Sequence, residues 1–280
     1  MVYRTLIDLK TLERHLEDED WTIIDARFYL AEPERGERDY LDAHIEGAVY
    51  AHLDRDLSGA KTGSNGRHPL PKVADLARRF SSWGIDDTVQ VVAYDTAGGA
   101  FAARVWWLLR YLGHEAVAVL DAGEGLGERT RSGNETRPAR VFSAREQATM
   151  RVDAPFLEAK RDTCVVLDAR APERFRGDNE PLDPVGGHIP GALNHPFTDN
   201  LRTGGGFHDA STLADHFERS LSGRPAVDVV CYCGSGVTAC HNLLAMETAG
   251  LKGARLYPGS WSEWCADPER PIATGDPVES

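Results

Sequence analysis

Residues 227–239 read VDVVCYCGSGVTA, in which an apolar strand pattern runs into a glycine-rich turn and then into a helical pattern. Residues 90–100 repeat the arrangement in the first half of the chain, where they read QVVAYDTAGGA. Strands that alternate with helices predict parallel sheets that are covered by helices on both faces. We therefore expect an α/β protein with one such sheet in each half.

An internal repeat indicates that the two halves are related. Four short motifs occur twice, in the same order and separated by about half of the chain. They are DAR (25–27, 168–170), HIEGA and HIPGA (44–48, 188–192), VVAYD and VVCYC (91–95, 229–233), and LDAG and LYPG (120–123, 256–259). Between the copies, residues 123–138 are polar and glycine-rich and end in a proline, which is typical of a linker. The domains expected are residues 1–135 and 151–280, joined by a linker at 136–150.

The remaining elements follow from local patterns. Apolar runs predict strands at residues 21–25, 90–94, 117–120, 164–168, 227–232 and 254–257. Apolar residues at helical spacing predict helices at 101–112 and 239–249. Gly113 and Gly250 are the left-handed caps expected to end these helices. The bulky pair Trp106 and Trp107 indicates packing in a core or between domains.

Composition narrows the class of function. The 280 residues contain 31 Lys and Arg against 44 Asp and Glu, and the net charge of −13 argues against binding to nucleic acid or to an anionic membrane. No apolar run approaches the roughly 20 residues of a membrane span, and the N-terminus lacks a signal-peptide pattern, so a cytoplasmic location is expected. Five Cys in a chain of this length predict a reactive thiol rather than a disulfide framework.

Cys233 is the candidate for that thiol. It follows a buried strand of a parallel sheet, at the strand end where such sheets bind ligands. Gly234 and Gly236 let the backbone curl around it, so that amide N–H groups and a helix start point at the sulfur. This environment stabilises an anion on sulfur, either a thiolate or a persulfide. The alternative is a buried structural Cys at a strand end.

The loop at residues 233–238, CGSGVT, resembles the active-site loop of the rhodanese superfamily, in particular that of its mercaptopyruvate sulfurtransferases. Further pieces resemble the same superfamily at residues 25–27, 44–48, 104–107, 188–192 and 259–264. The resemblance implies two tandem rhodanese-like domains, each a mostly parallel sheet flanked by helices. It also implies that the second domain is catalytic, while the first, with Asp95 at the Cys position, is inactive.

The same resemblance implies transfer of sulfur by a ping-pong mechanism. A small anionic donor would pass its outer sulfur to Cys233, and the persulfide would give that sulfur to cyanide, a small thiol or reduced thioredoxin. The residues expected to hold the persulfide anion through their amides are Gly234, Gly236, Val237 and Thr238. The Thr238 hydroxyl either adds a donor or only caps the helix. Neither a cofactor nor a metal is expected.

A proton relay acting on the donor thiol is also implied by the resemblance to mercaptopyruvate enzymes. The matching residues are Ser235 in the loop, His68 in the run GRHPLP at residues 66–71, and Asp54. Ser235 alone is a weak base, and a His68 oriented by Asp54 would activate it. Asp54 and His68 lie in a long connection that is expected to face the loop of the second domain. The alternative for His68 is a merely solvated side chain in a Gly- and Pro-rich loop.

Donor recognition requires cations, because the usual donors of the family are anions. Arg174 matches the family's first substrate arginine, with a surface salt bridge as the alternative. The family's second arginine, in a Glu-Pro-Arg run, is missing because Leu182 stands in its place. Arg176 is the geometric substitute that the sequence offers. Mercaptopyruvate is the favoured donor, thiosulfate is the alternative, and Leu182 also leaves open a non-enzymatic sulfur-relay or regulatory module.

Two other classes of site are disfavoured by the residues themselves. A phosphatase loop of the Cys-(x)5-Arg type needs an arginine where this chain has Ala239, so a phosphoester would lack its main charge partner. A metal site would have to be built from Cys231, Cys233, Cys240 and His241. Because side chains alternate along a strand, Cys231 and Tyr232 point to opposite faces of the sheet. The sequence also offers no second matching pair of ligands.

Overall fold

The structure is a computed structural model that describes residues 2–121, 123 and 125–276. The repeat position Ala122 and the linker position Glu124 lie outside the described residues. The chain divides into two compact units. The first comprises Met1–Gly59, Leu70–Gln147 and Thr203–Phe207, and the second comprises Ala60–Pro69, Ala148–Arg202 and His208–Ser280. Residues 60–69 therefore belong to the second unit, although they interrupt the first in sequence.

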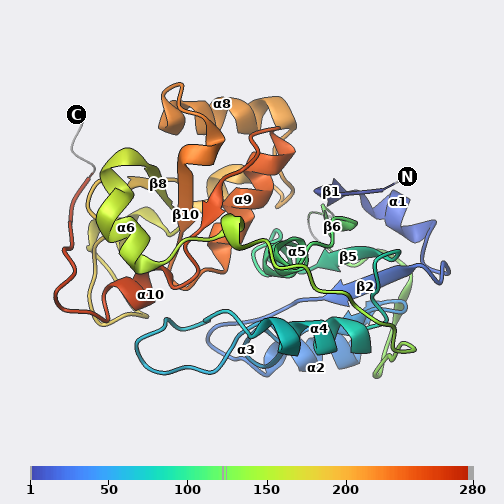
Figure 1. The fold of residues 1–280 in the computed structure, drawn as a ribbon. Coiled ribbons are helices and arrows are strands. Elements are labelled where there is room, and N and C mark those ends of the chain that lie inside the picture. Colours follow the sequence, from blue (N-terminus) through green and yellow to red (C-terminus); the bar gives the residue numbers. More distant parts are fainter. Residues whose placement is uncertain (1, 122, 124, 277–280) are drawn as a thin grey trace. The chain divides into compact units, whose positions relative to one another are not determined.

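The first unit contains a parallel five-stranded sheet (Figure 1). In spatial order its strands are β1 (Leu6–Ile7), β6 (Val117–Leu120), β5 (Gln90–Tyr94), β2 (Trp21–Asp25) and β4 (Val49–Tyr50). The strands predicted at residues 21–25, 90–94 and 117–120 are thus confirmed. A separate antiparallel pair joins β3 (His44–Ile45) to β7 (Thr130–Arg131). Because β7 lies within residues 123–138, this polar segment contains a short strand that its composition does not predict.

Helices flank this sheet in the sequence order that the alternating pattern predicts. Those of the described residues are α1 (Leu9–Glu13), α2 (Arg35–Asp42), α3 (Leu53–Asp56), α4 (Val73–Ser82) and α5 (Ala102–Tyr111). Helix α5 confirms the helix predicted at 101–112, and Gly113 follows it with a φ of +84°. Both tryptophans of α5 are buried: Trp106 Nε1 donates to the backbone oxygen of Arg4 at 2.8 Å, and Trp107 stacks on Tyr111.

The second unit contains a parallel four-stranded sheet (Figure 1). In spatial order its strands are β11 (Arg255–Leu256), β10 (Val229–Tyr232), β8 (Val165–Asp168) and β9 (Leu193–Asn194). The α-helices of the described residues are α6 (Ala154–Lys160), α7 (Pro172–Arg176), α8 (Ala210–Leu221), α9 (Thr238–Thr248) and α10 (Ser260–Trp264). Short 3-10 turns lie at η1 (Ala148–Met150), η2 (Arg161–Thr163), η3 (Phe197–Asn200) and η4 (Ala226–Asp228). The predicted helix at 239–249 is confirmed as α9, and Gly250 follows it with a φ of +83°.

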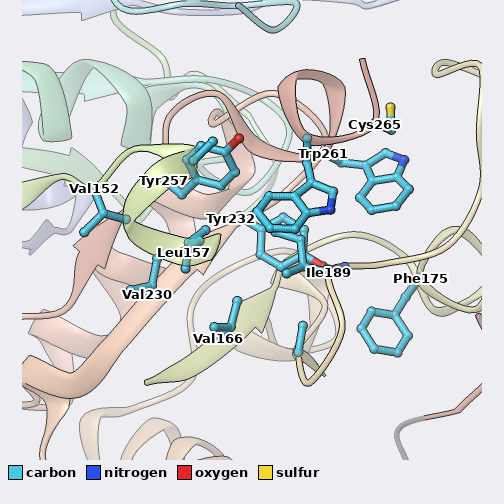
Figure 2. Close-up of a cluster of buried hydrophobic side chains, with 13 residues drawn as sticks. Val152, Leu157, Val166, Phe175, Ile189, Val230, Tyr232, Tyr257, Trp261 and Cys265 are labelled. Atoms are coloured by element: carbon cyan, nitrogen blue, oxygen red, sulfur yellow. Dashed lines mark hydrogen bonds between the residues drawn. The ribbon is translucent and has the colours of Figure 1, made fainter. Parts of the chain in front are cut away.

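One face of this second sheet forms an apolar core (Figure 2). Val166 of β8 and Tyr232 of β10 lie in it together with Leu157 of α6 and Trp261 of α10. Each of these side chains is at most 2% exposed, and burying a side chain of this size contributes about 1.5–3 kcal/mol. Since neighbouring strand residues point to opposite faces, Cys231 points away from this core.

The repeated DAR motif forms the same buried ion pair in each unit. Arg27 Nη2 donates to Asp25 Oδ2 at 2.6 Å, and Arg170 Nη2 donates to Asp168 Oδ2 at 2.6 Å. Both carboxylates are fully buried at the end of a central strand. Loss of one partner would leave the other charge buried and unpaired, which is strongly destabilising. The motif therefore has a structural role in both units.

The repeated histidines also have matching surroundings. His44 stacks on Tyr40 with ring centroids 4.2 Å apart, and its Nδ1 lies 2.7 Å from the backbone oxygen of that residue. His188 stacks on Phe175 at 3.7 Å, and its Nδ1 lies 2.9 Å from the backbone oxygen of Phe175. Each ring thus joins a helix to the following loop, and the two units share local structure as well as sequence.

The segment that follows β6 is hydrogen-bonded to the first unit along its length. The amide of Gly133 donates to Leu41, that of Arg140 to Ser81 and that of Gln147 to Tyr111. These bonds place the chain up to residue 147 with the first unit. None of the helices in the described ranges combines the length and the hydropathy that a membrane crossing requires.

Candidate active site

Cys233 lies directly after β10, in the loop that leads into α9. Cys233 is buried, with 2% of its surface exposed. Its amide donates to Ser260 Oγ at 3.1 Å, and its backbone oxygen accepts from the amide of Trp261 at 2.9 Å. The start of α10 therefore fixes the backbone of Cys233 from one side.

The loop presents a backbone amide to the sulfur. The N–H of Gly236 donates to Cys233 Sγ at 3.2 Å. Gly236 has a φ of +76°, and a Cβ there would lie 2.4 Å from the backbone oxygen of Pro258, so this turn requires glycine. Val237 is buried, and Thr238 is the first residue of α9. A backbone N–H that donates to a sulfur is suited to hold an anion there.

Thr238 is not the cap of this helix. The N-cap position of α9 is Val237, which makes no side-chain capping hydrogen bond. The structure therefore excludes Thr238 as the N-cap residue of α9. Among the described residues, no contact of the Thr238 hydroxyl with Cys233 is observed. Its role as a donor to the persulfide therefore stays a prediction.

Ser235 and His68 form a buried pair in the second unit. Ser235 Oγ lies 2.7 Å from His68 Nδ1, and the two residues are 6% and 5% exposed. Residues 60–69 carry His68 to the loop, and the amide of Arg67 holds them by donating to Ser262 Oγ at 3.0 Å. The merely solvated histidine is excluded by this burial. A hydroxyl bonded to an imidazole is an arrangement that moves protons.

Asp54 lies in α3 of the first unit. Its amide donates to His52 Nδ1 at 3.2 Å at the start of that helix. The hydrogen bond between Ser235 and His68 thus lies within one unit, whereas Asp54 belongs to the other. Its place as the third member of the relay stays a prediction.

Arg174 is held by buried carboxylates rather than by surface partners. Its Nη2 donates to Glu180 Oε1 at 2.7 Å, and its Nε donates to both oxygens of the same carboxylate. The pKa of Glu180 is lowered because hydrogen bonds from Arg174 and from the amide of Leu182 outweigh the effect of its burial. Arg176 pairs instead with Asp178 at 2.7 Å, on a half-exposed part of α7.

Two residues near the loop were not singled out by sequence reasoning. Asp183 accepts from Arg67 Nε at 3.0 Å and from Arg67 Nη2 at 3.1 Å, and from Arg174 Nη2 at 3.2 Å. Burial raises the pKa of Asp183 in spite of the charge of Arg67. The only sequence signal for Arg67 is its position next to His68. Asp183 directly follows Leu182, the position where the resemblance called for an arginine.

The corresponding loop of the first unit is filled by its own carboxylate. Asp95 follows β5, and its oxygens accept from four amides of the loop and of the start of α5, at 2.7–2.9 Å. These amides belong to Ala97, Gly99, Phe101 and Ala102. Burial raises the pKa of Asp95, against the lowering effect of these bonds. The first unit thus holds a fixed carboxyl group where the second holds a thiol.

Clusters of His, Cys, Asp or Glu arranged to hold a metal are absent from the described part of the chain. The Sγ of Cys240 donates to the backbone oxygen of Gly236 at 3.3 Å, and His241 Nδ1 lies 3.2 Å from the side-chain amide nitrogen of Asn200.

Known proteins resemble this chain over both units. The family of Rhodanese-like domains matches residues 8–124 and 154–267. A probable 3-mercaptopyruvate sulfurtransferase of Pseudomonas aeruginosa is 46% identical over 279 residues, which cover 97% of this chain and 98% of that protein. A putative thiosulfate sulfurtransferase of Mycobacterium tuberculosis, SseB, is 39% identical over 265 residues, which cover 91% of each chain. Among solved structures, SseA of Escherichia coli, titled a 3-mercaptopyruvate sulfotransferase, has a TM-score of 0.77 with 30% identity and covers 92% of this chain and 99% of that one.

Proposed function

Because the chain belongs to the family of Rhodanese-like domain proteins, we propose that it is a sulfurtransferase that carries sulfur on Cys233 and favours mercaptopyruvate as the donor. The observation that carries the proposal is the loop after β10. There the amide of Gly236 reaches Cys233 Sγ at 3.2 Å, beside a Ser235 hydroxyl that is bonded to His68. A nucleophile with an anion-stabilising amide and a neighbouring proton carrier suits covalent catalysis.

In the first half-reaction, the Cys233 thiolate attacks the sulfur of mercaptopyruvate. A sulfur–sulfur bond forms, the carbon–sulfur bond breaks, and its electron pair leaves with the carbon as the enolate of pyruvate. The proton of the donor thiol is transferred to that carbon, so the products are pyruvate and a Cys233 persulfide anion. The amide of Gly236 favours this anion on the enzyme.

In the second half-reaction, an acceptor removes the outer sulfur. A thiolate or cyanide attacks that sulfur, the sulfur–sulfur bond breaks, and Cys233 is released as the thiolate. The acceptors that we propose are a small thiol, reduced thioredoxin or cyanide. The step balances without an oxidant or a reductant, because the nucleophile supplies the electron pair of the new bond to sulfur and Cys233 keeps the pair of the broken sulfur–sulfur bond.

The proton transfer of the first half-reaction is assigned to Ser235 and His68. The 2.7 Å bond between them provides a path from the donor thiol to an imidazole, whose ordinary pKa lies near neutrality. Asp54 is proposed to orient His68 and to stabilise its protonated form, as a carboxylate does in other hydroxyl–imidazole sites.

A second candidate donor is thiosulfate. It is favoured by Leu182, whose half-exposed apolar side chain cannot bind a carboxylate, and a relative 39% identical to this chain is named as a putative thiosulfate sulfurtransferase. Thiosulfate is itself an anion, and Arg174 would bind it as well as it binds a carboxylate.

Steady-state turnover with the two donors, measured side by side with cyanide as the acceptor, tests the choice. We expect kcat/KM for mercaptopyruvate to exceed that for thiosulfate by at least about tenfold, because only mercaptopyruvate has a thiol proton for the Ser235–His68 pair to move. Thiocyanate formation gives the rate with either donor. A preference for thiosulfate would remove mercaptopyruvate as the favoured donor and most of the support for the relay.

A further inference from the structure

Two guanidinium groups lie against Gly234, the residue that follows Cys233. A Cβ built on Gly234 would lie 2.5 Å from Arg67 Nη2, 3.3 Å from Arg174 Nη2 and 3.4 Å from Arg174 Nη1. The glycine thus leaves room for both groups to approach the backbone beside the sulfur. Arg67 comes from residues 60–69 and Arg174 from α7, and both belong to the second unit.

A buried carboxylate holds the two arginines together. Asp183 forms a bidentate ion pair with Arg67, in which Arg67 Nε and Nη2 donate to its two oxygens. One of these oxygens also accepts from Arg174 Nη2. The Asp183 side chain is 3% exposed, whereas those of Arg67 and Arg174 are 27% and 17% exposed. The anchoring carboxylate is therefore out of solvent, while the two arginine side chains remain partly exposed.

The anchored arginines keep one edge free. All hydrogen bonds of the Arg67 and Arg174 side chains within the described residues use Nε or Nη2, and none uses Nη1 of either residue. Planar oxyanions such as carboxylates bind best to two N–H groups presented side by side. Two fixed guanidinium edges beside a nucleophilic sulfur form such a site.

We propose that Arg67 is a second donor-binding residue, which holds the anionic end of the sulfur donor together with Arg174, and that Asp183 is the positioning residue for both. The proposal rests on the function proposed above and identifies the donor class as small molecules that carry both a transferable sulfur and a carboxylate or a comparable oxyanion. The second arginine of the family is missing because Leu182 stands in its place, and Arg67 supplies the second cation from residues 60–69 instead.

Replacement of Arg67 tests the proposal through the Michaelis constant. Arg67→Gln should raise KM for mercaptopyruvate about 10- to 100-fold and change kcat less than about threefold, because a charge-assisted contact to the donor is lost while Cys233 remains in place. Arg67→Lys should give a smaller increase, since it keeps the charge and loses the planar fork. Asp183→Asn should raise KM about 3- to 10-fold with kcat retained.

Arg224→Gln is the matched control, because Arg224 is also paired with a carboxylate of the second unit, that of Asp228, but is not placed against Gly234. Its KM should equal that of the unaltered protein. A KM for Arg67→Gln equal to that of the control overturns the proposal. If Arg67→Gln melts at a much lower temperature, Arg67→Lys decides: a raised KM supports the proposal and an unchanged KM overturns it.

Calorimetric titration with pyruvate separates this proposal from the proposed function. Pyruvate carries the carboxylate of the donor without its sulfur, so its binding does not depend on turnover. We expect Arg67→Gln to bind pyruvate at least about tenfold more weakly than the unaltered protein or Arg224→Gln. Equal affinities, or no binding of pyruvate to the unaltered protein, overturn the role of Arg67. Weaker binding without any sulfur transfer would support the anion site and reject the sulfurtransferase.

Discussion

Cys233→Ser will lower turnover with mercaptopyruvate and with thiosulfate by at least about 10⁴-fold. A serine hydroxyl is not ionised near neutral pH, and its oxygen cannot carry a sulfane sulfur in place of a thiolate. The substitution replaces the sulfur atom by oxygen and leaves the rest of the loop unchanged, so the amide of Gly236 remains available to a ligand. Thiocyanate formation from cyanide measures the loss with both donors.

Cys164→Ser is the matched control for this experiment. Cys164 is a free, half-buried thiol of the second unit that directly precedes β8, away from the loop. Its replacement should leave turnover unchanged with either donor. Turnover of Cys233→Ser within tenfold of this control would contradict the assignment of Cys233 as the sulfur carrier.

His68→Asn will lower kcat/KM for mercaptopyruvate by about 10²- to 10³-fold and will affect thiosulfate much less. Turnover of mercaptopyruvate requires that its thiol proton be transferred to the pyruvate carbon, whereas the outer sulfur of thiosulfate carries no proton at neutral pH. The 2.7 Å contact with Ser235 Oγ is the basis for assigning this proton transfer to His68. The ratio of the two kcat/KM values reports the relay separately from general damage to the loop.

Ser235→Ala should show the same selective loss, and the double variant should lose little more than either single variant, because the two residues act as a unit. Asp54→Asn should reproduce part of the effect if Asp54 orients His68. His216→Asn, which changes a half-buried histidine of α8, is the control and should behave as the unaltered protein with both donors. Equal losses with the two donors in His68→Asn would assign His68 a structural role only.

Much of the fold could be predicted because its signals are local. The positive φ of Gly113 and of Gly250 follows from a glycine at the end of an apolar helical pattern. Strand ends were less predictable. The strand predicted at 227–232 starts too early, because Val227 lies in η4 and is 55% exposed. An apolar pattern does not distinguish a strand from the turn that leads into it.

The candidate site was predictable only in part, because it depends on contacts between distant residues. Cys233 and Ser235 are neighbours in a recognisable loop, and a motif match is enough to find them. Arg67 reaches Gly234 only because residues 60–69 fold onto the second unit, and no periodicity of the sequence encodes this. Asp183 is likewise 116 positions from the arginine that it holds, and only the tertiary structure shows their pairing.

Mass spectrometry after one addition of mercaptopyruvate without an acceptor tests whether Cys233 carries the sulfur as a persulfide. We predict that the protein gains the mass of one sulfur atom, that fragmentation places it on Cys233 rather than on Cys231 or Cys240, and that cyanide removes it as thiocyanate. Pyruvate should form in equal amount. An unmodified protein, or a sulfur that is bound to another cysteine, would contradict this assignment.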